Sequence, residues 1–152
     1  MDERALGAAA LLAALDDAGR SFRDFGYRLF LTHQSVRWAS AGRVGHAVAP
    51  CASVGVGFLI DNADREVSLG VDVWVRDHGF EVTGDAAADD PLPGPSGGGN
   101  QRTLRDLPGV VTRDLDECIA VLTRYTAELC AYTSVLDDLQ VPRTEDSVGR
   151  SP

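Results

Sequence analysis

The fold is decided by residues 51–84, which read CASVGVGFLIDNADREVSLGVDVWVRDHGFEVTG. In residues 53–61 and again in residues 65–76, every second side chain is apolar, which is the pattern of strands that bury one face. The apolar positions are Val54, Val56, Phe58, Ile60, Val67, Leu69, Val71, Val73 and Val75. We predict that the two runs form an antiparallel hairpin and that a third strand continues from Phe80.

The spacing also predicts how these strands pair. If residues 62–65 form a four-residue loop, Phe58 faces Leu69 and every inward pair is apolar. A slip of one residue would turn charged side chains into the core, which should fix the register. The second turn, residues 76–80, fits a type I turn in which Gly79 is a left-handed bulge residue.

The opposite face of this hairpin carries glycine at positions where a strand usually has side chains. The predicted register places Gly57 opposite Gly70 and leaves Trp74 on the same face. Glycine inside a strand often marks the close approach of another group. Either Trp74 or a packed helix covers these glycines, or the face is a shallow surface on which a partner docks.

The first hairpin turn adds carboxylates at the end of that face. Asp61 and Asp64 lack the ligand spacing of a calcium-binding EF-hand loop, so we expect an acidic turn that arginines of a partner could contact. The predicted partner-binding residues are Gly57, Asp61, Asp64, Gly70, Asp72, Trp74 and Arg76.

The chain before the hairpin predicts one helix and several short strands. Residues 3–18 carry an apolar stripe at helical spacing and are followed by Gly19, a typical helix stop. Residues 24–32 alternate in a way that predicts a strand, and residues 36–39 and 44–49 fit two further short strands around a glycine-containing loop. We therefore expect one to three strands in this part of the chain.

The chain after the hairpin predicts a loop, an edge strand and a long helix. Residues 84–101 are rich in Pro, Gly, Asp and Ser, so we expect a disordered surface loop, with a lid over a site as the alternative. Residues 102–111 fit a short edge strand. A helix is predicted over residues 115–139, with a capping-box-like start at Asp114, and residues 141–152 fit a flexible tail.

These elements predict an α+β fold, in which an antiparallel meander of four to six strands packs against an N-terminal helix and a long C-terminal helix. The chain of 152 residues has the length of one domain, which we place at residues 1–140. The final helix would be about 37 Å long at 1.5 Å per residue, longer than a small sheet requires. Its free part could join two copies in a homodimer along residues 115–139.

Composition narrows the partners and the compartment. The formal net charge of −9 argues against nucleic acid and against an anionic membrane, and it is compatible with a basic protein or a cationic ligand as partner. Cys51, Cys118 and Cys130 form no metal-binding or disulfide pattern, so we expect reduced thiols in the cytoplasm. The amino terminus lacks the pattern of a signal peptide, and no apolar run has the length of a membrane span.

The sequence contains no recognisable catalytic, metal-binding or cofactor motif. All 14 basic residues are arginine, which excludes a lysine nucleophile and is typical of a GC-rich bacterial genome. His33, His46 and His78 lack metal-binding spacings, and the glycines form no phosphate-binding loop. We therefore expect no catalytic residue, no metal and no cofactor.

Two kinds of function fit these observations. The first is a non-enzymatic protein-binding module, such as an immunity protein, a secretion chaperone or an adaptor. The alternative is a small-molecule-binding protein or an enzyme, with a pocket between the sheet and the C-terminal helix. Tyr125, Tyr132, Trp38, Trp74 and one histidine would line that pocket.

Overall fold

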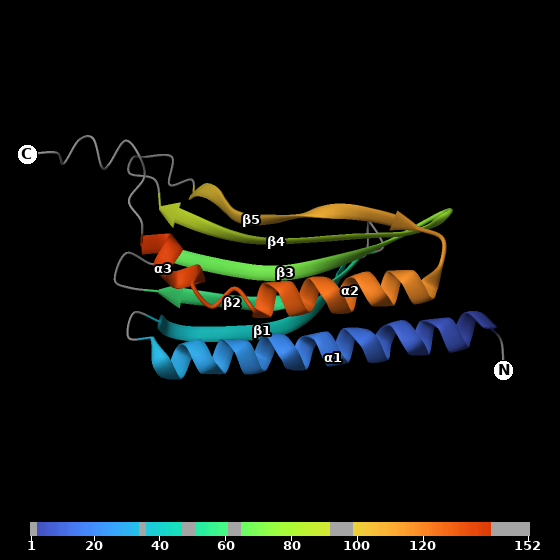
Figure 1. The fold of residues 1–152 in the computed structure, drawn as a ribbon, viewed down its shortest axis with the longest axis horizontal. Helices are drawn as coiled ribbons and strands as arrows, with labels where there is room; N and C mark the ends of the chain where they lie inside the picture. The colour runs from blue at the N-terminus through green and yellow to red at the C-terminus, as the bar shows by residue number, and fades with distance from the viewer. Residues whose placement is uncertain (1–2, 34–35, 47–50, 61–64, 92–98, 141–152) are drawn as a thin grey trace, which may run out of the picture.

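The computed structural model describes residues 3–33, 36–46, 51–60, 65–91 and 99–140. Its elements are α1 (Glu3–Thr32), β1 (Val36–His46), β2 (Cys51–Ile60), β3 (Arg65–Arg76), β4 (Gly79–Pro91), β5 (Gly99–Thr112), α2 (Leu115–Cys130) and α3 (Val135–Gln140). The five strands pair antiparallel in chain order, and α1 and α2 lie side by side (Figure 1). The predicted α+β meander with a helix before it and helical structure after it is confirmed.

The first helix is one continuous element of 30 residues. Its buried side chains follow helical spacing and are Leu15, Ala18, Phe22, Phe25 and Leu29. The predicted strand over residues 24–32 is wrong, because its alternation counted Tyr27 and Leu31, which the helix leaves 58% and 79% exposed. The predicted stop at Gly19 is also wrong, since this glycine lies inside the helix and faces the side chain of Val54.

β1 is a single strand of 11 residues where the sequence predicted two short strands around a loop. Its central residues pair with β2 in an unbroken register in which Gly42 lies opposite Gly55. Glycine and serine weaken a strand by their own propensity, and pairing with a well-patterned neighbour overrides that weakness. Residues 47–50, which include the end of the predicted strand over residues 44–49, lie outside the described residues.

The β2–β3 pairing keeps the predicted faces and differs from the predicted register by two residues. Phe58 lies opposite Val67 rather than Leu69, and the last pair before the connection is Ile60 with Arg65. A shift of two residues leaves every side chain on its own face. Apolar alternation therefore predicts the faces and cannot detect such a shift.

The β3–β4 connection is short. Arg76 pairs directly with Gly79, so only Asp77 and His78 lie between the paired residues. Gly79 has the positive φ that the prediction required, at 144°. A Cβ at Gly79 would also lie 3.1 Å from the Cα of Arg113, so this position requires glycine for two reasons.

The predicted disordered loop over residues 84–101 is wrong at both ends. Residues 84–91 complete β4 and residues 99–101 begin β5, while residues 92–98 lie outside the described residues. The composition was misleading because Ala86 and Ala88 are fully buried on the inner face, where their small side chains complete the core once the backbone pairs with β3. Ala87 lies opposite Ser68 on the other face of the sheet and is 4% exposed.

β5 is the predicted edge strand and extends over 14 residues. Its register with β4 shifts between Val82 and Gly84, where Pro108 and Gly109 lie in the longer stretch of β5. A proline lacks the N–H that a central strand needs, and an irregular edge strand tolerates it.

The second helix starts as predicted at its N-cap, Asp114, whose carboxylate accepts a hydrogen bond from the backbone N–H of Asp116 at 3.0 Å. In the predicted capping box, Glu117 would contact the Asp114 backbone directly, whereas in the structure Thr112 lies between them. Thr112 Oγ1 accepts a hydrogen bond from the Asp114 N–H at 3.0 Å and donates one to the Glu117 carboxylate at 2.8 Å. This relay connects the end of β5 to the start of α2.

The predicted continuous helix over residues 115–139 is wrong, because α2 ends at Cys130 and α3 begins at Val135. Tyr132, Val135 and Leu136 are buried on both sides of the break. The helical spacing of buried residues therefore continues across the turn between α2 and α3, and this spacing alone does not show that the helix is interrupted. The predicted homodimer along residues 115–139 assumed one long helix that projects beyond the sheet, and these residues form two shorter helices instead.

The hydrophobic core lies between the inner face of the sheet and the helices. Its largest fully buried side chains include Phe22, Phe25, Phe58, Leu69, Leu122, Leu129 and Leu136. The rings of Phe25 and Phe58 meet edge to face with centroids 6.2 Å apart, which joins α1 to β2.

A pair of identical substitutions two residues apart tests the helical assignment of the α1 C-terminal half. Leu29→Ala is expected to lower the free energy of unfolding by about 2–4 kcal/mol, because the side chain is buried. Leu31→Ala is the matched control and should change it by only about 0.5 kcal/mol. Urea denaturation measures both. Equal losses would contradict the helix, because residues 29 and 31 share a face only in a strand.

Candidate functional site

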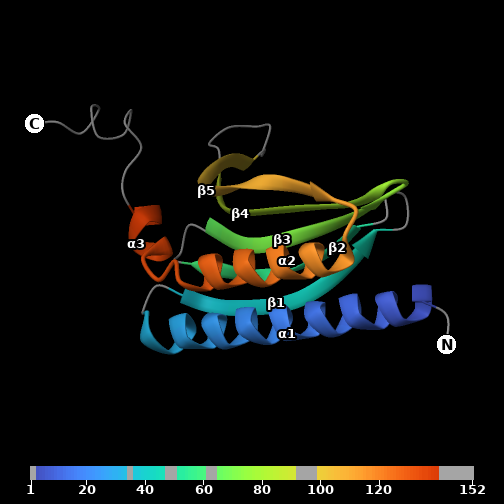
Figure 2. The ribbon, with the colours of Figure 1, turned by 45° about the vertical axis from the view of Figure 1, so that its right-hand side comes forward.

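One face of the sheet is covered by the helices and the other carries no helix in the described part of the chain. α1 contacts β1 and β2, and α2 contacts β3, β4 and β5, so together they span the inner face (Figure 2). The alternate residues point the other way, and we call their surface the open face. On the three central strands it includes Cys51, Ser53, Gly55, Gly57, Ser68, Gly70, Asp72, Trp74, Arg76, Glu81, Thr83, Asp85 and Ala87.

The predicted partner-binding residues of β2 and β3 share the open face. The set Gly57, Gly70, Asp72, Trp74 and Arg76 alternates with the buried valines and leucines of the same strands. The predicted opposite positions are corrected by the two-residue shift, because Gly55 rather than Gly57 faces Gly70. Asp61 and Asp64, the predicted acidic turn, lie outside the described residues.

The centre of the open face is bare backbone. Gly55 and Gly70 lie opposite each other, and a Cβ on Gly55 would lie 2.8 Å from the Cα of Gly70. Trp74 pairs with Cys51, and Gly55 lies four residues from Cys51 on β2, which corresponds to about 13 Å at 3.3 Å per residue. The backbone position of Trp74 is therefore not next to the glycines, and no described helix covers them.

One end of the open face is an ordered aromatic and ionic corner. The guanidinium of Arg76 lies 4.9 Å from the ring centre of Trp74, in cation–π contact. It also donates a hydrogen bond to the Glu81 carboxylate at 2.8 Å. The indole is half-buried, so part of the ring stays accessible beside the stacked guanidinium.

A hydrogen bond crosses the open face beside this corner. The Ser53 hydroxyl on β2 donates to the Asp72 carboxylate on β3 at 2.5 Å, and the Cys51 sulfur lies 3.8 Å from the same hydroxyl. Burial raises the pKa of the Cys51 thiol, the Asp72 charge raises it further, and the Ser53 hydrogen bond and Arg76 lower it. The net shift is upward, so Cys51 remains a protonated thiol at neutral pH.

Carboxylates form a row across β3, β4 and β5 on the open face. Asp85 lies directly opposite Asp106 and next to the Asp72 position. Burial, then the negative charges of Asp72 and Asp106, raise the pKa of Asp85 above its ordinary value. Asp85 and Asp106 are not among the predicted partner-binding residues, because Asp85 falls in the predicted loop over residues 84–101 and Asp106 in the predicted edge strand over residues 102–111, and neither segment has a clear alternation that assigns a face.

These groups do not form a metal site or a nucleophile. Among the residues that the structure describes, no group of three His, Cys, Asp or Glu side chains could hold a metal ion. Burial raises the pKa of both Cys118 and Cys130 to about 11, which makes their thiolates scarce at neutral pH.

The histidines do not converge. His33 lies before β1 and His46 ends it, so the two are separated by the length of that strand. The Nε2 atom of His33 lies 3.8 Å from the Asp137 carboxylate of α3. His78 is exposed in the turn between β3 and β4.

The residues of the alternative small-molecule pocket lie on different sides of the sheet. Tyr125 and Tyr132 are buried on the inner side, where the Tyr125 hydroxyl donates to the Pro108 carbonyl and the Tyr132 hydroxyl donates to Asp138. Burial, followed by the hydrogen bond and charge of Asp138, raises the pKa of Tyr132 to about 12. Trp74 belongs to the open face, so these aromatic rings cannot line one cavity.

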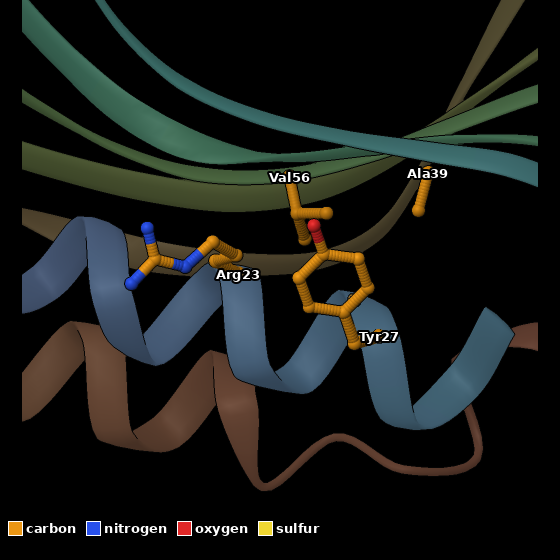
Figure 3. Close-up of a pocket in the computed structure, with 5 residues that line it drawn as sticks. Arg23, Tyr27, Ala39 and Val56 are labelled. Carbon is orange, nitrogen blue, oxygen red and sulfur yellow. The ribbon is translucent and has the colours of Figure 1, made fainter. Parts of the chain in front are cut away.

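Two small hollows border α1. The first, of about 90 Å³, lies where α1 passes β1 and β2, and Figure 3 shows Arg23 and Tyr27 beside Ala39 and Val56 there. It exists because Gly26 brings the helix close to the sheet, since a Cβ would lie 2.8 Å from Val56 Cγ2. The first hollow is far below the size of a typical ligand pocket, about 300–1,000 Å³.

The second hollow is a groove of about 300 Å³ between α1 and α2. It is lined mostly by small side chains, among them Ala14, Ala18 and Ala127. The Thr126 hydroxyl at its side is buried and has no hydrogen-bond partner among the described residues. This groove is open and carries no convergent charged or catalytic set, so its geometry favours no particular chemistry.

Comparison of the chain with protein families, with curated proteins and with solved structures finds no match. Within the described ranges, no helix combines the length and the hydropathy that crossing a membrane requires.

The carboxylate row predicts a stabilising substitution. Because the pKa of Asp85 is raised in the folded state, the folded protein binds this proton more tightly than the unfolded chain does, and the ionised carboxylate lowers stability at neutral pH. Asp85→Asn should therefore raise the free energy of unfolding at pH 7 by up to about 0.5 kcal/mol. The gain should disappear as the pH falls through the folded pKa toward the ordinary value of 3.8.

Thermal unfolding between neutral and acidic pH measures this effect. Asp77→Asn removes one charge in the β3–β4 turn, away from the row, and serves as the matched control. A loss of stability in Asp85→Asn at pH 7 would show that the row does not carry the mutual repulsion described above.

The thiols predict slow alkylation in the folded state. At pH 8, Cys118 and Cys130 should react with iodoacetamide about a hundredfold or more slowly than in denaturant, because a pKa near 11 leaves few thiolates. Mass spectrometry of the alkylated peptides gives the rate for each cysteine. Rapid labelling of Cys118 in the native protein would contradict its burial.

Proposed function

We propose that this protein is a non-enzymatic protein-binding module, comparable in kind to immunity proteins, secretion chaperones and adaptors, and that its partner docks on the open face. The observation that carries the proposal is the make-up of that face, in which bare glycine backbone is bordered by an ordered tryptophan and by carboxylates.

The centre of the open face suits a close approach of another chain. Side chains are missing at Gly55, Gly57 and Gly70, so a partner residue could reach the strand backbone there. Trp74 stands at the border, with Arg76 stacked on it. Tryptophan and arginine are the residue types that most often dominate binding energy in protein interfaces, and here both are already ordered before binding.

Charge favours a basic partner. The chain has a formal net charge of −9, and Asp72, Asp85 and Asp106 concentrate negative charge on the open face. A bound cationic group would reduce the repulsion between these carboxylates. This local effect would favour a basic partner in addition to the long-range attraction from the net charge. The same charge opposes nucleic acid and anionic membranes as partners.

The cysteines fit a protein that works in the cytoplasm. Cys51 and Cys118 are buried free thiols, and Cys130 is a partly buried one. Free thiols of this kind persist in a reducing compartment. This compartment is part of the proposal and would be tested by localising a tagged full-length chain.

The proposal is tested by affinity capture with one substitution on the open face and one on a helix. Ser68→Arg places a bulky positive charge beside Gly57 and breaks no hydrogen bond that the structure describes, since Ser68 is exposed. It should weaken capture of the partner by about tenfold or more, corresponding to at least about 1.4 kcal/mol.

Glu128→Arg on the exposed side of α2 is the matched control and should leave capture unchanged. Quantitative mass spectrometry from a native lysate compares both variants with the wild type. Equal capture by wild type and Ser68→Arg would remove the open face as the docking surface, and recovery of no basic protein would remove the charge argument.

A further inference from the structure

The groove between α1 and α2 has a buried hydroxyl group in its floor. Of the residues that line it, Ala18 and Thr126 are only 5% and 4% exposed, and Ser21 and Thr123 form part of its exposed rim. All of the lining residues belong to the two helices, which lie side by side in Figure 2. The groove is therefore on the helix side of the molecule, apart from the open face.

The Thr126 hydroxyl lacks the hydrogen bond that a threonine in a helix commonly makes. Thr123, one turn earlier on α2, donates its proton to the carbonyl of Ile119, four residues back, at 2.9 Å. Thr126 Oγ1 has no partner among the residues that the structure describes. A buried polar group costs free energy when nothing pairs with it, so nearly all such groups in folded proteins are satisfied by protein, water or ligand.

Helical geometry places Thr126 on the side of α2 that borders the groove. Ile119, Thr123 and Cys130 also line the groove, and they lie seven and three residues before Thr126 and four residues after it. Residues at these spacings share one side of a helix. The Thr126 side chain therefore stands in the middle of the groove wall that α2 forms.

The hydroxyls of the groove differ in what they can offer to a bound molecule. Each hydroxyl has one proton to donate and two lone pairs that accept. Thr123 and Ser21 use their protons on the carbonyls of Ile119 and Asp17, so they can only accept from a ligand. Thr126 still has its proton to donate. A ligand group that accepts from Thr126 and donates to Thr123 satisfies both, and a hydroxyl is the simplest group of this kind.

The spacing of the two threonines suits one bridging oxygen. Residues three apart on a helix have Cβ atoms about 5–6 Å apart, and two hydrogen bonds of about 2.8 Å span such a gap. The groove volume of about 300 Å³ is about twice that of a cavity of 150 Å³ that holds benzene, so a molecule of about ten non-hydrogen atoms fits.

The remaining lining favours an uncharged and mostly apolar molecule. It consists mainly of alanines and Ile119, and the Cys130 thiol stays neutral because burial raises its pKa to about 11. Asp17 is the one charged residue among the described lining residues, and it already forms an ion pair with Arg20 at 2.8 Å.

We propose that the groove between α1 and α2 binds a small uncharged alcohol, whose apolar body lies against Ala14, Ala18 and Ile119 and whose hydroxyl bonds to Thr126 and Thr123. The groove has no charged or catalytic set, so the alcohol is bound and not converted. The site does not depend on the open face, and it would remain if the proposed partner docking failed.

Titration with three probes tests the site and the class of its ligand. Benzyl alcohol offers a hydroxyl, acetophenone offers an acceptor without a proton, and toluene offers neither. Amide NMR of the full chain should show shifts at Ala18, Thr126 and Cys130, with affinity highest for benzyl alcohol and lowest for toluene. The absence of these shifts at millimolar benzyl alcohol would overturn the proposal.

Thr126→Val removes the hydroxyl and keeps the shape of the side chain. It should weaken the binding of benzyl alcohol about tenfold, as expected for the loss of one hydrogen bond, and leave the binding of toluene unchanged. Without ligand, the variant should have a higher Tm than the wild type, because it no longer buries an unpartnered hydroxyl. A lower Tm, or an unchanged affinity for benzyl alcohol, would show that this hydroxyl is not available to a ligand.

Ala127→Leu at the rim tests the position of the bound probe. The larger side chain fills part of the groove, so the affinity for all three probes should fall. Ala9→Leu is the same substitution at an exposed site of α1 outside the groove, and this matched control should bind like the wild type. Alanine and leucine are both strong helix formers, so both variants should fold. Unchanged binding by Ala127→Leu would place the probe elsewhere and overturn the site.

Discussion

The structure depends on the burial of a single face of one sheet against α1 and α2. The alternating valines, leucines and Phe58 of β2 and β3 supply the sheet side of this contact, and Phe22, Phe25 and Leu122 supply much of the helix side. Full burial of each such side chain contributes about 1.5–3 kcal/mol. Close approach is needed for this burial, and glycines in α1 at positions 19 and 26 permit it where the helix meets Val54 and Val56.

One-sided burial has a direct consequence for function. When both helices lie on one face, the residues that alternate with the core must face away from them, whatever their chemistry. In this chain those residues are glycines, a tryptophan stacked by an arginine, and aspartates, among them Asp85, whose pKa is raised by burial and then by the charges of Asp72 and Asp106. This make-up, with an aromatic border and neighbouring carboxylates, is the basis on which we propose that the open face binds a basic partner.

The same constraint explains why α1 stands out. Its inner side fills the core, so its exposed leucines and aromatic residues are not required for the folding of one chain, and polar residues there would cost little.

The sequence by itself determined the class of the fold, the meander, the inner and outer faces of β2 and β3, and the start of α2 at Asp114. Each of these follows from interactions between near neighbours in the chain or from a period of two, which are written directly in the order of residues. It also placed Asp72, Trp74 and Arg76 on one face, because every second residue of a strand points to the same side of the sheet.

Tertiary structure decided the rest, for reasons that local patterns do not contain. The register of β2 against β3 differs by two residues from the spacing prediction, because such a shift keeps all faces and only the fit between strands selects it. Residues 24–32 and 84–91 are a helix and a strand because packing against the sheet outweighs alternation in the first and loop-like composition in the second. The carboxylate row joins three strands, so it exists only once the chain has folded.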